Sequence, residues 1–345
     1  MENKIKNYKI FCIFLILMIV LLFTLIVTMG SISIKGSTVW KIIINKLLRE
    51  EVFVKDWKNS IEIIVWNIRI PRIIASLLSG GALTLVGILM QCLTKNPLAS
   101  PYILGISSGA STGAVLAIIF FNNIMFSVPL SAFILGSITA FIVFFFSEKG
   151  GFSNTKLVLT GVAISSLFSG LTTLIITIAP KENDVRDALF WMSGSLSGIE
   201  WENIPIIGIV LIVATILIYP KYREMNILVT GDENALTLGV NVKKIRIFLM
   251  LISTLVTGVI VSNTGIIGFV GLIIPHITRV LIGGNHKKVI PIAILLGGLF
   301  LMLTDTITRV IFSSQEIPIG VITSIIGVPF FLQMLRKRGY RFRGE

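Results

Sequence analysis

The sequence predicts an all-α polytopic membrane protein with ten transmembrane helices, because composition, hydropathy and spacing agree. Hydrophobic residues make up 54% of the 345 residues and charged residues only 14%, which leaves too little polar surface to cover a soluble globule. The mean hydropathy is +0.93. Apolar runs of about twenty residues, the length of a bilayer-spanning helix, recur between short polar segments. We therefore expect one transmembrane domain over residues 1–345.

The first apolar run is longer than a signal-peptide core and lacks a small-residue cleavage site, so we interpret it as an uncleaved span. Between the first and second runs lies a mixed segment with three tryptophans among lysines and acids, typical of amphipathic helices at the membrane interface. The ten expected spans are residues 10–29, 70–93, 102–121, 126–147, 156–179, 204–219, 245–262, 266–282, 289–308 and 317–335.

Charge distribution predicts the orientation. Ten spans place both termini on one side, and the loops and tails on that side carry more lysine and arginine than the opposite loops, so both termini are expected to be cytoplasmic. The eight basic residues between Lys35 and Arg72 run against this bias. The net charge of +13 is explained by these loops, and nucleic-acid binding is excluded.

Cys12 and Cys92 both lie in apolar runs, with no spacing typical of a disulfide framework or a thiolate metal site.

Three arginines form the first candidate site: Arg69 and Arg72 before the second span, and Arg309 at the end of the ninth. Guanidiniums at one depth could pair with carboxylates of an external protein. Alternatively, arginines at span ends extend toward lipid phosphates. Asp305, four residues before Arg309, could also pair with it within one helix. The residues alone leave these alternatives open.

A short helix is predicted in the loop at 230–240, within a cytoplasmic helical segment at about 227–240. Thr230 and Glu233 have the spacing of a capping box, and Gly239 stands where a helix would end, which predicts about eight helical residues, or roughly 12 Å. Such a helix is a candidate contact for a cytoplasmic partner. An ordinary connecting helix is the alternative.

Small and hydroxyl residues mark two further features. Gly105, Gly109 and Gly113 form a small-residue stripe that predicts close helix packing. The fifth span carries hydroxyls on two faces, more than one packing seam needs, so part of it is a candidate polar path; its members are Ser165, Ser166, Ser169, Thr172 and Thr173. Hydroxyls that bond to backbone carbonyls of their own helix are the alternative.

Catalytic patterns are absent from the sequence. It contains no phosphate-binding loop and no HExxH motif, and its two histidines stand alone, so we expect neither an enzyme nor a metal site. Ionisable residues are almost missing from mid-span positions, which argues against an ion-coupled secondary transporter, the rival hypothesis. The sequence is typical of a conduit whose energy comes from a partner.

Several motifs together resemble the FecCD family, the permease subunits of ABC importers for iron-siderophores, haem and cobalamin. They are RIPR at 69–72, GxLxxxGxxMQxxxxNPLAxPxxLGxxxGA from Gly81 to Ala110, GDExAxxLGV at 231–240, GxIGFVGLIxPHxxR from Gly265 to Arg279, and DxxxR with ExPIGVxT from Asp305 to Thr323. They follow one another along nearly the whole chain.

The resemblance implies a type II ABC importer permease in the cell membrane, with ten spans and both termini cytoplasmic. It implies a second permease subunit in a homodimer or heterodimer, two cytoplasmic ATP-binding subunits that use ATP and magnesium, and an external substrate-binding protein; this chain itself would bind no cofactor. Arg69, Arg72 and Arg309 would receive glutamates of the binding protein. The residues expected to contact the ATPase are Gly231, Asp232, Glu233, Ala235, Leu238 and Gly239. A ferric siderophore is the first choice of substrate, with haem or cobalamin as alternatives.

Overall fold

The computed structural model describes residues 7–30, 32–121, 124, 127–148, 153–311 and 316–337, and these residues form helices and connecting segments without a strand. The first half contains α1 (Tyr8–Thr28), α2 (Gly36–Leu48), α3 (Asn59–Ile63), the π-helix η1 (Ile64–Arg69), α4 (Ile70–Leu93), the 3₁₀-helix η2 (Pro101–Leu104), α5 (Ile106–Phe120), α6 (Ser127–Glu148) and α7 (Asn154–Thr177). The second half contains α8 (Glu182–Met192), α9 (Ile204–Ile218), η3 (Tyr219–Lys221), α10 (Tyr222–Leu228), α11 (Asp232–Thr237), α12 (Val242–Thr264), α13 (Val270–Ile282), α14 (His286–Ile311) and α15 (Ile319–Lys337).

Seven stretches of helix within the described residues are long and apolar enough to cross a membrane: α1, α3 through α4, α6, α7, α9 through α10, α12 and α14. Three shorter apolar helices, within α5, α13 and α15, occupy the remaining expected runs. Two runs are shorter than expected because the backbone turns left-handed inside them. Gly105, with φ 68°, separates η2 from α5, and Phe269, with φ 67°, precedes α13.

The second expected span is much longer than its apolar run. It begins at Asn59 rather than Ile70 and continues for 35 residues through η1 into α4, so its polar first part extends beyond the apolar segment. A helix of that length is about 52 Å long, against roughly 30 Å of hydrocarbon in a bilayer. Hydropathy located the apolar part and missed the polar extension, whose Glu62 carboxylate is paired with Lys46 of α2.

The core is built around α4. Its most apolar segment is 83% buried, and it packs against α14, α12, α13 and α9. Gly80 faces the backbone of Gly297 on α14, and Gly87 faces the backbone of Gly271 on α13. A Cβ at either α4 position would overlap the opposite backbone, so these glycines permit the close approach of the helices.

The predicted packing role of the small-residue stripe in α5 is confirmed. Gly109 lies against Thr139 of α6, and Gly113 lies against the backbone of Ser131. In contrast, α1, α7 and α9 are on the periphery, where 17–22% of the most apolar segment is buried.

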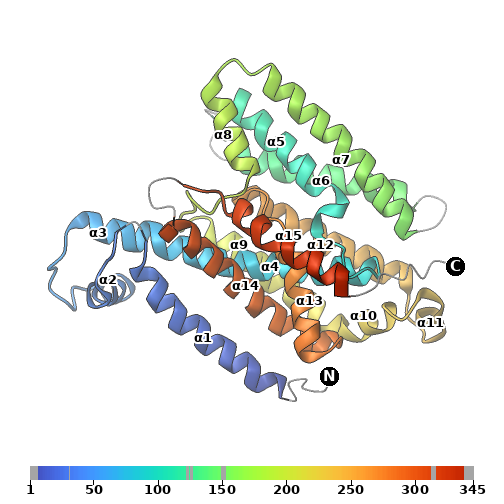
Figure 1. The fold of residues 1–345 in the computed structure, drawn as a ribbon, viewed down its shortest axis with the longest axis horizontal. Coiled ribbons are helices and arrows are strands. Elements are labelled where there is room, and N and C mark those ends of the chain that lie inside the picture. The colour runs from blue at the N-terminus through green and yellow to red at the C-terminus, as the bar shows by residue number, and fades with distance from the viewer. Residues whose placement is uncertain are drawn as a thin grey trace.

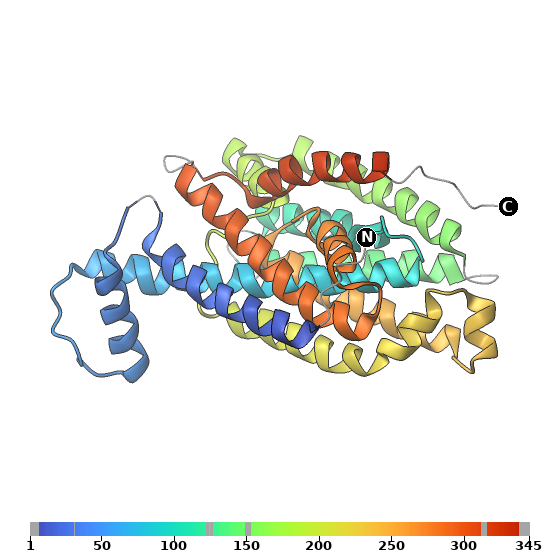
Figure 2. The ribbon, with the colours of Figure 1, turned by 60° about the horizontal axis from the view of Figure 1, so that its bottom comes forward.

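Figures 1 and 2 show α4 running along the length of the molecule. At one end, which we call the arginine end, lie α2, α3 and the first turn of α4; at the other, the α11 end, lie α10 and α11. The first turn of α1 and the last turn of α15 both lie toward the α11 end.

Candidate functional site

The arginine end is shaped by the junction of η1 and α4. The wider turn of the π-helix ends at Arg69, and Pro71, which has no N–H to donate to the preceding turn, follows within the same continuous helix. The Arg69 guanidinium donates to the carbonyl oxygens of Val27, at 2.8 Å, and Ile32, at 2.5 Å. Gly30 leaves room for it, since a Cβ there would lie 2.8 Å from Nη2. Arg69 therefore fastens the segment after α1 to the long helix.

Arg72 and Arg309 share one buried carboxylate. Arg72 Nε donates to Oδ1 of Asp305 at 2.8 Å, and Arg309 Nε lies 3.1 Å from Oδ2. The Asp305 side chain is fully buried, and the two guanidinium side chains are 10% and 11% exposed. Arg72 also lies 3.8 Å from Glu316, which is 65% exposed. The cluster joins α4 to α14 through charge pairing in a poorly solvated place, where losing one partner is costly.

The structure thus brings the three predicted arginines together and confirms the pairing of Asp305 with Arg309. It also shows a pairing the sequence analysis missed, between Arg72 and Asp305, which lie 233 residues apart. The arginines turn inward onto protein atoms rather than outward. A partner's carboxylate would have to compete with these contacts, and their role in docking remains a prediction.

At the α11 end, the predicted short helix is present but begins and is capped differently. α11 has six residues instead of about eight, and its N-cap is Gly231, with φ 129°. The predicted capping box is wrong: the Thr230 hydroxyl donates back to the carbonyl of Ile227 at 2.8 Å. Glycine takes the N-cap because the chain turns there through a conformation that side chains disfavour. As predicted, Gly239, with φ 77°, ends the segment.

Asp232, the first residue of α11, is held from two other elements. Lys95 Nζ, directly beyond α4, lies 2.6 Å from one carboxylate oxygen, and Arg246 Nη2 of α12 lies 2.5 Å from the other. Partial burial alone would raise the pKa of the Asp232 carboxyl, but the hydrogen bonds and positive charges of Lys95 and Arg246 outweigh it and lower the pKa below its usual value. We call these three residues the Asp232 clamp. Lys95 and Arg246 were not predicted as part of this site, although Lys95 stands out in the polar turn between two spans.

The remaining predicted contact residues of α11 divide by exposure. Ala235 is fully buried and holds the helix against the protein. Glu233 is exposed, and Leu238 is 65% exposed beside Leu236 at 62%. Two leucines uncovered at the tip of a short helix, next to a carboxylate, form the kind of surface that a partner protein buries.

The residues of the predicted polar path on α7 also fall into two groups: three line a groove, and two form hydrogen bonds within the protein. Ser165, Ser166 and Ser169 line an open groove of about 310 Å³ beside Tyr102. Thr172 is buried and lies 2.7 Å, oxygen to oxygen, from Thr112 of α5, so it joins two helices. Thr173 is exposed and donates to the carbonyl of Ser169, as the self-bonding alternative predicts. Among the described residues, no group of three or more His, Cys, Asp or Glu side chains is arranged to hold a metal ion.

Comparison with known proteins gives consistent matches over most of the chain. The model of the FecCD transport family matches residues 16–337. The hemin transport system permease of Yersinia pestis is 33% identical over 335 residues, covering 95% of this chain and 96% of the relative. The cobalamin import system permease of Halobacterium salinarum is 38% identical over 281 residues, covering 81% and 75%. The Fe(3+) dicitrate transport system permease of Escherichia coli is 36% identical over 283 residues, covering 81% and 88%.

A solved structure has the same fold. It is a metal-chelate type ABC transporter in an inward-facing conformation, 30% identical, with a TM-score of 0.82 over 95% of this chain and 99% of that one. Together with the apolar helices, these matches identify a multi-pass membrane protein, and the chain belongs to the FecCD transport family of ABC permeases.

Proposed function

We propose that this chain is the membrane-spanning subunit of an ATP-driven importer that receives an iron complex from an external binding protein and releases it into the cytoplasm. The observation that carries this function is the placement of two charged clusters at opposite ends of one buried helix. Arg72 stands in the first turn of α4, and Lys95 of the Asp232 clamp lies two residues beyond its last residue. Arg72 and Lys95 are 23 positions apart in the sequence, or about 35 Å along a helix.

In this proposal the chain forms one transmembrane domain of ten spans, the seven long helical stretches and the three shorter apolar helices. The arginine end faces outward, and the α11 end and both termini face the cytoplasm. A second permease subunit, identical or different, completes the path, and two ATP-binding subunits contact α11 and use ATP with magnesium. This chain itself carries no cofactor.

The Asp232 clamp suggests how force would pass from the ATPase to the spans. A displacement of α11 acts on α4 through Lys95 and on α12 through Arg246. Both helices are largely buried, and α12 packs directly on α4. Their joint movement would open the path alternately to each side of the membrane. The groove beside Ser165 and Ser169 is the proposed lining of that path.

For the substrate we propose a ferric siderophore. Relatives are named for Fe(3+)-citrate, siderophore and iron(3+)-hydroxamate transport, and others for hemin and cobalamin. Iron complexes therefore recur among the relatives, and hemin or cobalamin import would use the same architecture.

Reconstitution in proteoliposomes tests the function. We expect uptake of a radiolabelled ferric siderophore only when the cognate ATP-binding subunits, the binding protein and ATP are all present. Uptake by the purified chain alone, or uptake driven by an ion gradient without ATP, would overturn the proposal. Labelling of single cysteines placed near each terminus tests the orientation, and accessibility from outside would contradict it.

A further inference from the structure

A second surface at the arginine end lies between the polar extension of the long helix and the turn before α9. It is a groove of about 460 Å³, and one wall comes from α3 and η1 while the other comes from the turn. We call it the Glu200 groove; the lining residues that matter are Ile63, Asn67, Ile68, Glu200, Trp201 and Glu202. It adjoins Arg69 along the chain, since Arg69 follows Ile68 directly.

The walls of the groove are held in place by specific contacts. The indole nitrogen of Trp201 donates to the carbonyl of Trp66 at 2.9 Å, and the two rings pack with centroids 5.0 Å apart. The backbone N–H of Glu200 donates to the side-chain oxygen of Asn203 at 3.0 Å, and Asn203 is bonded in turn to Asn263 of α12. The groove therefore exists before any partner binds.

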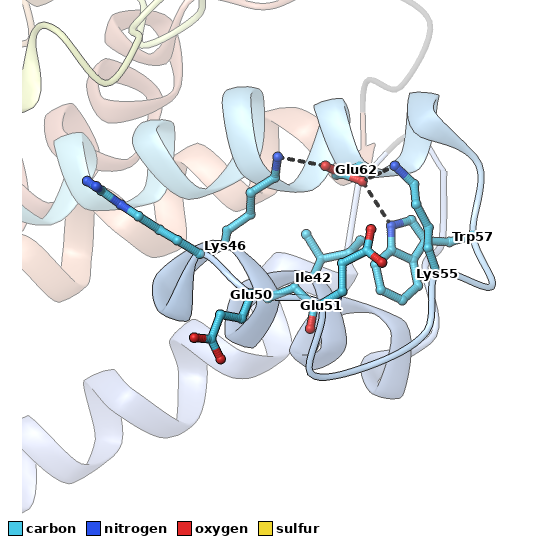
Figure 3. Close-up of a pocket in the computed structure, with 9 residues that line it drawn as sticks. Ile42, Lys46, Glu50, Glu51, Lys55, Trp57 and Glu62 are labelled. Atoms are coloured by element: carbon cyan, nitrogen blue, oxygen red, sulfur yellow. Dashed lines mark hydrogen bonds and ion pairs between the residues drawn. The ribbon is translucent and has the colours of Figure 1, made fainter.

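The groove combines free carboxylates with uncovered apolar surface. Glu200 and Glu202 are exposed, and neither forms an ion pair within the described part of the chain. Figure 3 shows the contrasting case of Glu62, whose carboxylate is bound by Lys46, Lys55 and the indole of Trp57. Ile63 and Ile68 are 52% and 51% exposed.

We propose that the Glu200 groove receives a lysine or arginine side chain of the external binding protein, an inference that rests on the proposed function. The aliphatic stem of such a side chain would cover Ile63 and Ile68. Its cation would lie between the two carboxylates and near the Trp201 ring, where charge pairing and cation–π attraction act together. No other common side chain satisfies an apolar wall and two carboxylates at once.

Together with the arginines, the groove would allow a partner to bind the arginine end in only one orientation. Arg69, Arg72 and Arg309 are the predicted contacts for acidic groups of a partner, whereas the Glu200 groove would favour a basic one. A partner that carries both in the matching arrangement fits in one orientation only, because a reversed approach would place like charges together.

The test measures binding of the purified cognate binding protein to the complete importer in nanodiscs. Glu200→Gln with Glu202→Gln should weaken binding about five- to twentyfold. The matched control, Glu182→Gln with Asp187→Asn, removes two negative charges from exposed positions on α8 and should change binding less than twofold. In parallel, a carbodiimide that joins carboxylates to contacting lysines should link Glu200 or Glu202 to the binding protein, as read by mass spectrometry.

The outcomes separate the groove from simpler explanations. Bulk attraction of an acidic binding protein predicts tighter binding by the double glutamine variant, and that result, or unchanged binding, would overturn the assignment. Equal weakening by the α8 control would do the same. Weakened binding without a cross-link identifies arginine as the guest, because its guanidinium does not react. If the wild-type complex transports without any binding protein, the proposed function fails and the groove assignment fails with it.

Discussion

At the arginine end Asp305 is fully buried between two guanidiniums, whereas at the α11 end Asp232 is 39% exposed between Lys95 and Arg246. Both are single carboxylates shared by two cations from separate elements. Burial makes the first a part of the core that holds α4 to α14. Asp232 is partly exposed, so the strength of its ion pairs depends on the solvent. The exposed leucines of α11 lie close to it in the chain. The same charge pattern therefore serves rigidity at one end and contact at the other.

The largest effect is expected from Asp305→Asn. An amide cannot neutralise Arg72 and Arg309, and removing one partner of a buried ion pair costs about 3–5 kcal/mol. The apparent melting temperature of the purified protein should fall by several degrees, and uptake by the assembled importer should be lost. Glu316→Gln is the control, because that exposed side chain lies 3.8 Å from Arg72. A stable and active Asp305→Asn variant would show that the buried carboxylate is not needed to hold α4 to α14, which would contradict the contrast drawn with Asp232.

A large effect on transport without loss of stability is expected from Leu236→Asp with Leu238→Asp. These side chains are 62% and 65% exposed, so the melting temperature should be nearly unchanged, within about 0.5 kcal/mol of stability per site. Charge on the tip of α11 should prevent copurification of the ATP-binding subunits and reduce uptake more than tenfold. Methionine at both positions should preserve assembly. Normal uptake by the aspartate variant would show that the ATPase contacts another surface.

A smaller effect should follow from Arg69→Met, which sharpens the comparison within the arginine end. Loss of the guanidinium leaves the buried carbonyl group of Val27 without its donor, at a cost of about 1–3 kcal/mol, and also removes the bond to the more exposed Ile32. Amide hydrogen exchange should rise in the segment after α1. Arg69→Lys should restore part of the protection, since one ammonium can reach a carbonyl. Exchange that stays at the wild-type level would contradict the fastening role.

The smallest effect concerns pH at the Asp232 clamp. The pKa of this carboxyl is lowered in the folded protein, so its stabilising contribution is complete above the ordinary carboxyl pKa and is lost as pH falls through the lowered value. Between pH 7 and 5, coupling of ATP hydrolysis to uptake should therefore show no step from this group. Asp232→Asn imitates the protonated form and should reduce coupling about two- to fivefold at pH 7. A step near neutral pH that disappears in Asp232→Asn would show that the clamp is weaker than its geometry indicates.

The candidate site was predictable where its contacts are local. The pairing of Asp305 with Arg309 follows from four-residue spacing on one helix, and the packing of Gly109 and Gly113 follows from their spacing in α5. The start of α11 was mispredicted because two possible N-cap residues, Thr230 and Gly231, are adjacent. The sequence does not reveal that the Thr230 hydroxyl donates to the preceding turn. Lys95 and Arg246 escaped notice because each reads as an ordinary basic residue near a span end.

What the sequence by itself determined is the membrane class, the positions of the apolar runs, the position of a short helix after Gly231, and the family. These features depend on hydropathy and on spacing within one or two helical turns. Only the tertiary structure decided that Arg72 meets Asp305, that Asp232 joins α4 to α12, and that the second span extends back to Asn59. Those contacts depend on how closely α4 approaches α12 and α14. The approach of α4 to α14 is permitted by Gly80 and Gly297, whose role appears only when the opposite backbone is in place.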